Sequence, residues 1–544
     1  MKKCGVLLLC LFAAVNLVFS QTVKITGVVI SAEDNEPVIG ASVVAKGTTT
    51  GTVTDVDGRF SLEIPSRVKT LVVSFVGMQQ QEVKAVPGMK VLLRSDALAI
   101  DEVMVVAYGT AKKSSFTGSA EVIKNDKIEA RTVANVSKAL DGTVAGLQTT
   151  SGGGQPGDGA KLVIRGFGSI NANNDPLYVL DGVPYDGDIS AINPADIESM
   201  SVLKDASASA LYGARGANGV VIITTKRGKS GAMNINLKAT WGVSSRAFPV
   251  YERVNSAEYM ELAYEALKNS YIYASGMSEA DAIQQTQASF MKELGGEQYN
   301  PFNVHSSQLI DPSTGKIAAN ARLKYEDDWF DEATRDCPVR QEYQFSANGG
   351  NDRTTYMFSL GYLNEKGLAI NTGFKRYSGR VGVESKLKNW LKGALSAQFS
   401  TTNQQYMQTG GSGYYNIWYS STMVAPIYPV YQRDENGNYL NGEKIFDYGD
   451  TRAAMSNMNW IAALLEDKRE RKSDNLTSRA YFELGDKNND NLGFLKDFKL
   501  TVNLGADYRN MNRLVYQNPN EGNAATVNGS SARTAERMLS FTFN

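Results

Sequence analysis

The chain has 544 residues and a formal net charge of −1, and charged residues make up 21% of it. Since it has no basic excess, nucleic acid is not an expected partner. The single histidine, His305, argues against histidine-based triads and multi-histidine metal centres, so we expect neither an enzyme nor a metal or cofactor site. The 50 glycines and 26 tyrosines are typical of a β-rich chain with several domains.

Residues 1–20 have the pattern of a secretory signal peptide. Two lysines precede an apolar core from Val6 to Phe19, and we expect cleavage before Gln21. Of the three cysteines, only Cys337 lies beyond this segment, so no intramolecular disulfide is expected in the exported protein. No later apolar run approaches the about 20 residues of a spanning helix, so any passage through a membrane is expected to use β-strands.

Residues 23–93 show short alternating strands separated by turn signals, which is the rhythm of a small β-sandwich. The expected strands are KITGVVI, IGASVVAK, GTVTDVDGRFSLEI and TLVVSFVG. Within the third of these, Asp55, Asp57 and Gly58 suggest a calcium loop, but Arg59 stands where such a loop needs an oxygen ligand. We therefore expect a hairpin turn at Asp57 and Gly58.

Residues 98–112 contain an extended, β-prone peptide, IDEVMVVAYGT, followed by a polar linker with lysines. Such a peptide can add as a strand to the sheet edge of a partner, because main-chain hydrogen bonds give affinity and alternate side chains give register. The alternative is one more strand of the sandwich.

Residues 177–228 hold two strand patterns around an Ala/Ser-rich helix, with no catalytic constellation. Asn193 is expected to cap a short helix that begins at Pro194, and Asp205 to cap a helix over residues 206–212 that Gly213 ends. The VVIITT run from Val220 to Thr225 predicts a strand buried on both faces. The glycines before it do not form a phosphate-binding loop, since no Lys-Ser/Thr pair follows and a strand comes next.

Upstream of this stretch, Thr132 is expected to cap a helix from Val133 to Leu140. The sequence SGGGQPGDG, from Ser151 to Gly159, predicts a glycine-rich loop.

From Met233 onward, apolar and polar residues alternate in eight segments of about ten residues, a length that suits membrane-crossing strands. A soluble sandwich would show the same alternation, so the connections decide between the two. They are long after the odd-numbered segments and short after the even-numbered ones, which fits a barrel with short periplasmic turns and long outer loops. The eight segments are 233–244, 341–349, 353–363, 374–387, 391–401, 475–485, 498–508 and 533–544.

The first and third long connections are the expected ligand-contacting surface. Their aromatic rings can stack on sugars or contact peptide side chains, and the alternative for some of them is an interfacial aromatic girdle. The candidate ligand-contacting residues are Tyr325, Trp329, Tyr414, Tyr415 and Trp418.

Two local features lie in these connections. A helix is expected from Asn255 to Lys268, with Glu258 at the third position of a capping box. Between the sixth and seventh segments, Asp486 and its neighbours partly copy a calcium loop, but Asn491 replaces the required glycine, so no metal is expected there.

The stretches VLDGVP, INPADIESMSVLKDASASALYGARGANGVVIITTKRG and IRGFGS (Ile164–Ser169) resemble the plug of TonB-dependent outer-membrane transporters, in the SusC/RagA branch of Bacteroidetes. The resemblance implies a mainly β fold. Its parts are a signal peptide (1–20), a carboxypeptidase-regulatory-like β-sandwich (23–93), a TonB box and linker (98–112), an α+β plug (113–228) and the first eight or so strands of a large antiparallel transmembrane β-barrel (232–544).

The resemblance also implies two sets of site residues. The TonB box comprises Asp101, Glu102, Val103, Met104, Val105, Val106, Ala107, Tyr108 and Gly109. The plug motif comprises Arg165, Gly166, Asp181, Gly182, Asp205, Tyr212, Gly213, Arg215 and Gly216. Arg165 and Arg215 are expected either to pair with acidic groups of the barrel wall or to be solvated.

By resemblance, the protein imports a nutrient across the outer membrane, with oligosaccharide the first expectation, peptide the second and a siderophore or cobalamin the third. The expected partners are TonB with its ExbB/ExbD energy complex, a SusD-like surface lipoprotein and outer-membrane lipid. A surface adhesin and a secreted hydrolase are the alternatives from other classes. Plugged transporters need about twenty-two strands, so we interpret the chain as the N-terminal portion of a longer protein or as a truncated product that cannot transport.

Overall fold

The computed structural model describes residues 22–32, 36–48, 50–75, 78–93, 103–106, 109–112, 120–171, 173–205, 209–247, 251–409, 416–485, 499–520 and 522–544. The chain divides into two units, residues 1–104 with 110–116 and residues 105–109 with 117–544. Strands dominate the described residues, which confirms a mainly β fold. None of the helices in the described ranges is long and apolar enough to cross a membrane. The expected signal peptide lies outside the described residues.

The first unit contains a β-sandwich of two small sheets. One sheet has the strand order β4 (Arg59–Pro65), β1 (Thr22–Ser31), β7 (Met89–Leu93), and the other has the order β3 (Gly51–Val53), β2 (Ser42–Ala45), β5 (Thr70–Phe75), β6 (Met78–Lys84). Alternate side chains of facing strands, such as Ile25, Val43, Leu62 and Leu71, fill the core between the sheets. This follows from the period of two along each strand.

The turn at Asp57 and Gly58 forms, but the hairpin expected there is wrong. The Asp55 carboxylate accepts hydrogen bonds from the backbone N–H groups of Asp57 (3.0 Å) and Arg59 (2.8 Å), and Gly58 has φ +70°. The strands on either side, β3 and β4, pair in different sheets. The turn therefore carries the chain from one sheet of the sandwich to the other.

Two short strands follow, β8 (Val103–Val106) and β9 (Gly109–Lys112), and they pair with each other. The residues between them, Ala107 and Tyr108, lie outside the described part of the chain.

The second unit begins with the plug. Its main sheet has the order β10 (Ala120–Lys124), β15 (Ile197–Leu203), β16 (Val220–Thr225), β13 (Leu177–Leu180), β14 (Val183–Pro184), and a separate hairpin joins β11 (Leu147–Thr150) to β12 (Lys161–Ile164). Strand β16 lies at the centre, and Val221, Ile222 and Ile223 have no exposed surface. The prediction of a strand buried on both faces is confirmed.

The plug helices are short: α2 (Asn125–Glu129), α3 (Val136–Ala139) and the 3-10 turns η3 (Ile189–Ala191), η4 (Pro194–Asp196) and η5 (Ala210–Gly216). The cap at Asn193 is confirmed, since its side chain accepts from the Ala195 N–H at 3.2 Å. The cap at Thr132 is wrong, because Asn135 caps α3 instead and accepts from the Ser137 N–H at 3.0 Å. Gly213 has φ 58° and ψ −146°, which are not helical, and it separates two short helical turns within the range of η5, so the expected helix end at Gly213 is confirmed. Residues 206–208 of the expected helix lie outside the described part of the chain.

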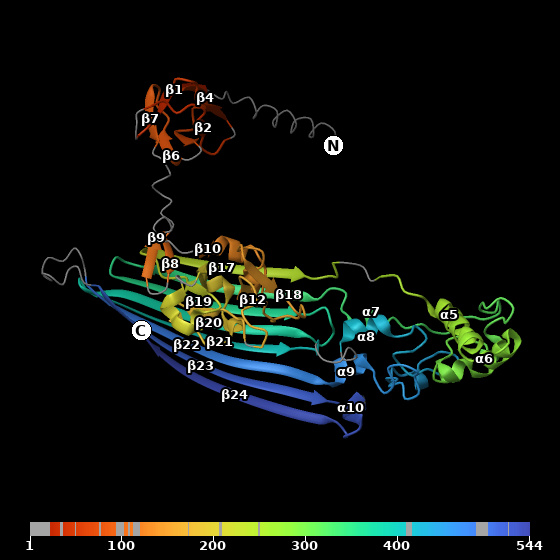
Figure 1. Ribbon diagram of the computed structural model, residues 1–544. Coiled ribbons are helices and arrows are strands. Elements are labelled where there is room, and N and C mark those ends of the chain that lie inside the picture. Colours follow the sequence, from red (N-terminus) through yellow and green to blue (C-terminus); the bar gives the residue numbers. More distant parts are fainter. Residues whose placement is uncertain are drawn as a thin grey trace, which may run out of the picture. The chain divides into compact units, whose positions relative to one another are not determined.

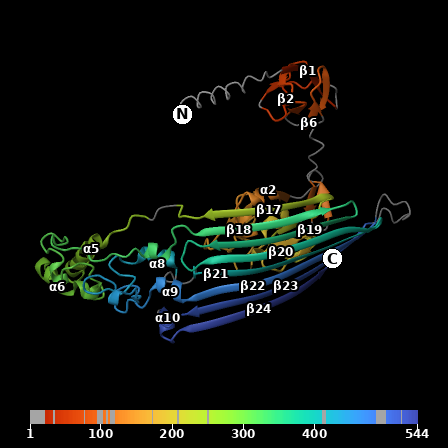
Figure 2. The same ribbon diagram turned by 180° about the vertical axis from the view of Figure 1, so that it is seen from behind.

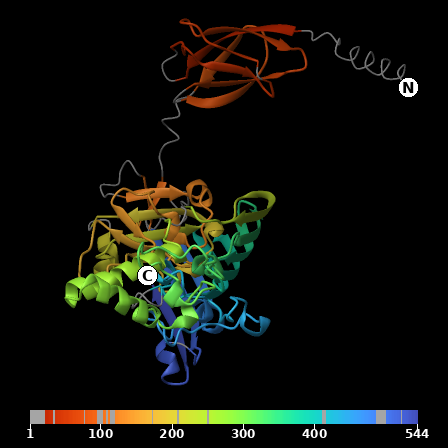
Figure 3. The same cartoon turned by 90° about the vertical axis from the view of Figure 1, so that its right-hand side faces the viewer.

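Eight long strands form a second, consecutive antiparallel sheet, here called the wall sheet (Figures 1 and 2). Its strands are β17 (Gly231–Val243), β18 (Val339–Gly350), β19 (Thr354–Lys366), β20 (Gly373–Lys388), β21 (Leu391–Gln405), β22 (Lys468–Leu484), β23 (Leu500–Gln517) and β24 (Ser530–Phe543). All eight expected segments are therefore confirmed as strands, and the plug lies against one face of the sheet (Figure 3).

The wall strands are 12 to 18 residues long, and several extend past their expected ends. Strand β22 starts at Lys468, before the expected position 475, with the sequence KRERKSD. These residues show no alternation of apolar and polar side chains, because both faces of the strand meet polar surroundings near its end. A strand of this kind cannot be recognised from hydrophobic periodicity in the sequence.

The described parts of the long connections, residues 244–247, 251–338, 406–409 and 416–467, fold together into a loop lobe at one end of the wall sheet (Figure 1). It contains α5 (Ser256–Asn269), the π-helical turn η6 (Ser270–Ala274), α6 (Glu279–Glu293), α7 (Trp329–Ala333), α8 (Ile417–Met423) and α9 (Trp460–Glu466). The capping box is confirmed: the Glu258 N–H donates to Asn255 Oδ1 at 2.9 Å, and the Asn255 N–H donates to Glu258 Oε2 at 3.0 Å.

Candidate functional site

The wall sheet has its apolar side chains on the outside. In the strand registers, one row crosses all eight strands and points away from the plug: Leu237, Phe345, Leu360, Gly379, Phe399, Leu476, Tyr508 and Leu539. Leu237 is 76% exposed and Leu539 is 61% exposed. A continuous exposed apolar belt of this kind is found on sheets that face lipid.

The opposite face carries polar side chains that are buried against the plug. The adjacent row includes Gln344, Ser378, Ser400 and Asn475, all buried. This polarity is the reverse of a soluble sandwich, in which apolar side chains point inward. The buried contact between plug and wall is therefore held largely by hydrogen bonds and ion pairs.

The most concentrated contact between plug and wall surrounds Arg376 of β20, which is 2% exposed. Its Nη1 donates to the backbone oxygens of Ala134 (2.7 Å), Ser190 (3.3 Å) and Ile192 (3.3 Å), and its Nη2 donates to Asn193 Oδ1 (3.2 Å). One wall side chain thus contacts three plug segments at once: the residue before the cap of α3, the turn η3 and the residue after it, and the cap of η4.

Asn193 completes this contact from the plug side. Its Nδ2 donates to Gln344 Oε1 of β18 at 2.7 Å and to Ser378 Oγ of β20 at 3.3 Å. The neighbouring Asp196 is 1% exposed, and burial raises the pKa of its carboxyl, although nearby Arg380 acts in the opposite direction. The helix cap found in the sequence is therefore also a docking point on the wall.

A second contact lies at the Asp181-Gly182 turn between β13 and β14. Asp181 (φ 49°) accepts from the Thr225 N–H at 2.9 Å and from Thr225 Oγ1 at 2.6 Å, and its carboxylate lies 3.6 Å from the Arg380 guanidinium of β20. Burial would raise the pKa of Asp181, but Arg380 and the Thr225 hydrogen bonds lower it overall. The plug-motif aspartate is therefore an ionised group paired with the wall.

A third contact joins the end of the plug to the beginning of the wall. Glu129 of α2 lies 2.8 Å from Lys226 and 3.0 Å from Lys238 of β17. Partial burial opposes ionisation, but the two lysines lower the pKa of Glu129 to about 2. Nearby, Arg227 Nη1 donates to Glu384 Oε2 of β20 at 3.2 Å.

The expected partners of Arg165 and Arg215 are corrected. Arg165 pairs with Asp205, and Arg215 pairs with Asp186 at 2.5 Å, so both acidic partners belong to the plug and not to the wall. Both arginine side chains are 53% exposed. Arg165 directly follows β12 and Arg215 lies in η5, and each meets an acidic group of another plug segment.

The remaining plug-motif residues shape turns of the plug or pack within it. Gly166 (φ 94°) and Gly182 (φ 85°) follow non-glycine residues that also have positive φ, Arg165 and Asp181, so each pair makes a tight turn. Gly216 packs against Ser209, and Tyr212 is buried.

At the lobe-side end of the wall, the glycine-rich plug loop is tied to β21 and to the chain just after it. Gln155 Nε2 donates to the Met407 carbonyl at 3.1 Å, and its Oε1 accepts from the Met407 N–H at 2.7 Å. Gln404 Nε2 donates to the Pro156 carbonyl at 2.9 Å and to Asp158 Oδ1 at 2.7 Å. The side chain of Gln404 therefore points toward the plug, which shows which face of β21 is the inner one near its lobe-side end.

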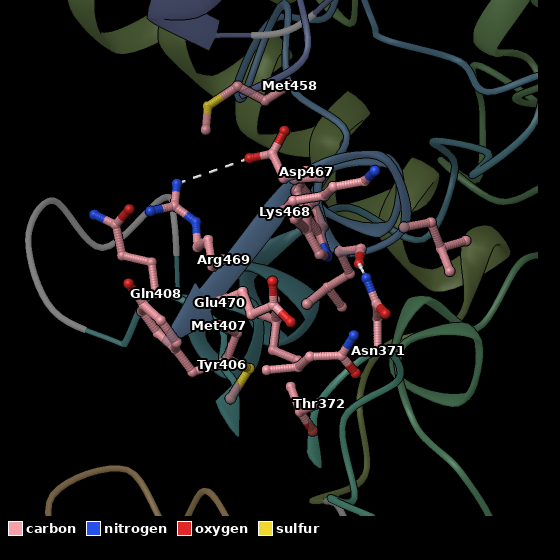
Figure 4. A pocket seen from close by; sticks show the side chains of 16 residues that line it. Asn371, Thr372, Tyr406, Met407, Gln408, Met458, Asp467, Lys468, Arg469 and Glu470 are labelled. Carbon is pink, nitrogen blue, oxygen red and sulfur yellow. Dashed lines mark hydrogen bonds and ion pairs between the residues drawn. The ribbon is translucent and has the colours of Figure 1, made fainter. Parts of the chain in front are cut away.

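A cavity of about 400 Å³ lies beside this point, between the ends of β21 and β22 and helix α9 (Figure 4). Its polar lining includes Asn371, Tyr406, Gln408 and Arg469, and Arg469 approaches Asp467 to 3.7 Å. Trp460 and Leu464 supply apolar surface. A polar wall with apolar patches can hold a hydrated, flexible ligand through hydrogen bonds and stacking.

The expectation that Tyr325 and Trp329 contact ligand is wrong. They are 7% and 1% exposed, and Trp329 stacks on Trp460 with ring centroids 4.2 Å apart and donates to the Tyr428 carbonyl at 2.8 Å. Trp329 belongs to the core of the loop lobe, which needs large rings because it is built from connections without sheet hydrogen bonding. Tyr325 is buried in the same lobe, where its hydroxyl donates to the Ile427 carbonyl at 3.4 Å.

The other candidate rings have different outcomes. Trp418 is half-buried against Phe330, with centroids 5.3 Å apart, while Tyr414 and Tyr415 lie outside the described residues. Two tyrosines of the lobe were not identified from the sequence as ligand-contacting candidates, although both rings are exposed: Tyr251 (93% exposed) and Tyr273 (83% exposed). No pattern in the sequence separates them from the buried tyrosines.

In the TonB box, only the backbones of Val103–Val106 and Gly109 fall within the described residues. The Asp486 segment lies outside them.

A polar-lined, apolar-coated wall sheet with a folded plug on its inner face defines the class of plugged β-barrel receptors. Comparison with known proteins leads to the same class. Residues 112–220 match the TonB-dependent Receptor Plug Domain, and residues 25–105 match the CarboxypepD_reg-like domain. The chain belongs to the TonB-dependent receptors of SusC/RagA type.

Among its relatives, TonB-dependent receptor SusC of Bacteroides thetaiotaomicron is 32% identical over 514 residues, which cover 90% of this chain and 45% of SusC. TonB-dependent receptor P39 of Formosa agariphila is 29% identical over 80% of this chain and 37% of its own length. A structure of the RagAB peptide importer in the open-open state superposes with a TM-score of 0.60 at 26% identity, covering 81% of this chain and 46% of that one. The chain thus spans less than half the length of these relatives.

Proposed function

We propose that this chain supplies the plug and part of the wall of a TonB-dependent importer in the outer membrane. In this proposal a nutrient binds on the loop-lobe side, TonB pulls the segment Asp101–Gly109 from the periplasm using energy from the ExbB/ExbD complex, and the plug is remodelled to open a path. No bond in the substrate is broken.

The observation that supports this best is the nature of the contact between plug and wall. Arg376, Asn193, Asp181 and Gln404 make hydrogen bonds and ion pairs to groups that water can replace. A contact of this kind can open and close again at modest cost, whereas separating an apolar interface would expose hydrophobic area at about 25 cal/mol per Å².

The same proposal gives the apolar belt from Leu237 to Leu539 a role as the lipid-facing surface. A SusD-like surface lipoprotein is the proposed partner on the loop-lobe side, by likeness to SusC and to RagAB. The proposed location is the outer membrane, with the sandwich and TonB box in the periplasm.

For the substrate, we propose an oligosaccharide first, and the specific reason for a peptide as second candidate is the likeness to a peptide importer. Siderophore or cobalamin uptake ranks third, since the matches that cover most of this chain are to SusC and RagAB.

Import can be tested by growth and uptake assays with the full-length gene. Deletion of Asp101–Gly109 is expected to abolish accumulation of a labelled oligosaccharide or peptide while leaving the protein in the outer membrane. A matched deletion in the exposed turn around Gly47 of the sandwich should leave uptake intact. Undiminished uptake after loss of the TonB box, or in a strain without TonB, would contradict the proposal.

A further inference from the structure

Two arginines face each other directly on the inner face of the wall. In the register of β22 and β23, Arg471 is paired with Arg513. Like charges placed opposite each other on one face of an antiparallel pair are destabilising. The arrangement therefore costs stability unless a negative group is shared between them.

The inward direction of this pair follows from its neighbours. Arg471 lies opposite Gln404 in the register of β21 and β22, and Gln404 contacts the plug loop at Asp158. On the same face of the wall, Asn475 and Arg479 continue the row down β22 and are buried against the plug. Arg471 and Arg513 lie one step beyond the plug, on the side of the loop lobe.

Both guanidinium groups gather at one aromatic ring. The Arg471 and Arg513 guanidinium carbons lie 5.5 Å and 5.7 Å from the centroid of the Tyr406 ring, and Arg513 Nε donates to the Tyr406 hydroxyl at 2.7 Å. Tyr406 also lines the cavity of Figure 4. Stacking on one ring holds the two planar groups in place and leaves their other N–H donors free for a ligand.

Several other inward arginines of the wall have carboxylate partners, whereas Arg376 donates to plug oxygens instead. Arg479 forms a bidentate pair with Asp507, both distances 2.9 Å, and Arg509 pairs with Glu536. Arg380 lies near Asp181. For Arg471 and Arg513, by contrast, no carboxylate among the described residues comes within 4.0 Å.

We propose that Arg471, Arg513 and Tyr406 form an anion-binding subsite that takes a carboxylate group of the imported ligand. The arginines would donate charge-assisted hydrogen bonds to the two carboxylate oxygens, and the Tyr406 ring would keep the guanidinium planes in position. The inference rests on the proposed function, and it narrows the substrate to an acidic oligomer. A uronic-acid oligosaccharide and a peptide with a free carboxylate offer the same group.

Binding to the purified full-length protein in detergent tests the subsite without any need for TonB. Tetragalacturonate is compared with its fully methyl-esterified form, and an acidic tetrapeptide with its methyl ester, by titration calorimetry. We expect wild type to bind at least one acid roughly tenfold more tightly than its ester, and Arg471→Gln with Arg513→Gln to remove this preference. Whichever acid shows the preference identifies the source of the carboxylate.

Lys472→Gln is the matched control, since Lys472 is adjacent to Arg471 but points to the opposite face beside Glu470. It should keep the preference for the acid. Tyr406→Phe keeps the ring but loses the acceptor for Arg513, and should weaken acid binding only a fewfold.

Three results would overturn the subsite: equal binding of acid and ester by wild type, no binding of either acid, or an unchanged preference in the double variant. A folded double variant is verified by its heat-modifiable migration. Because the assay uses no energy source, a failure of import would leave these binding results unaffected, and loss of acid binding would leave import of neutral ligands possible.

Discussion

At the residue scale, Arg376 shows how the wall holds the plug. The guanidinium donates to three carbonyl oxygens and one amide oxygen, and no carboxylate lies within ion-pair distance of it among the described residues. Burial lowers the solvation of this charge, so the four acceptors are needed to offset it. Removing the charge while keeping the shape should therefore loosen the plug and leave the wall intact.

We predict that Arg376→Gln makes the plug open more often. A reporter cysteine at Ala139, which is fully buried in the plug, in a Cys337→Ser background should react with a maleimide roughly tenfold faster at sub-denaturing urea. Lys375→Gln, on the same strand but facing outward, is the control. Labelling at the wild-type rate in Arg376→Gln would show that the plug is held elsewhere.

A second residue-scale prediction concerns pH. The pKa of Glu129 is lowered from 4.5 to about 2, so its contribution to stability is complete above pH 4.5 and is lost as the pH falls toward 2. The link from α2 to Lys226 and Lys238 should weaken over that range. Thermal unfolding of wild type should lose more stability than Glu129→Gln between these pH values, and parallel curves for the two proteins would count against the link.

At the element scale, helix α5 of the loop lobe shows that a helix inside a long connection still begins at a local capping motif. Helix α5 has both hydrogen bonds of the capping box, and its buried face, with Met260 and Tyr264, packs into the lobe core. Its start is fixed by Asn255, since the first turn of a helix has N–H groups without partners in the helix. The cap and the core contact together keep the lobe ordered.

We predict that Asn255→Ala destabilises α5 by about 1 kcal/mol. Hydrogen exchange over residues 256–269 should become faster, with little change in the wall strands. Asn255→Asp can still accept the Glu258 N–H and should restore protection. Equal exchange in the alanine and aspartate variants would mean that core packing alone fixes the start of the helix.

At the scale of the whole molecule, the wall sheet presents opposite polarities on its two faces. The register aligns one apolar residue from nearly every strand into a belt, so a single charge in that belt would meet lipid on every side. The inner face can accept charge, as Arg376 and Arg479 show, because the plug supplies oxygens there.

We predict that Leu476→Arg, at the middle of β22, costs about 2–4 kcal/mol in folding into a bilayer. The fraction of heat-modifiable, folded protein recovered from outer membranes should fall. Leu465→Arg in α9 is the control, because Leu465 is exposed to a similar extent (50% against 46%) but belongs to the loop lobe. Similar losses for both variants would argue against a lipid-facing belt.

Features that depend on neighbours along the chain could be predicted from the sequence. The period of two placed all eight wall strands, the caps at Asn193 and Asn255 depend on residues within one turn, and the buried run Val220–Thr225 is recognisable from its own composition. The plug stretches around Asp181 and Asp205 carry the family likeness. Each of these is a short-range property, which a single sequence records.

The folded structure was needed to show which distant groups meet. It placed Arg165 and Arg215 on acids of the plug, buried Trp329 in the lobe core, and brought Arg376 to plug carbonyls far away in the chain. The opposition of Arg471 and Arg513 depends on the register of two strands, and a slip of one residue would turn one of them to the outer face. Register and docking arise from the sum of many long-range contacts, and no local pattern encodes that sum.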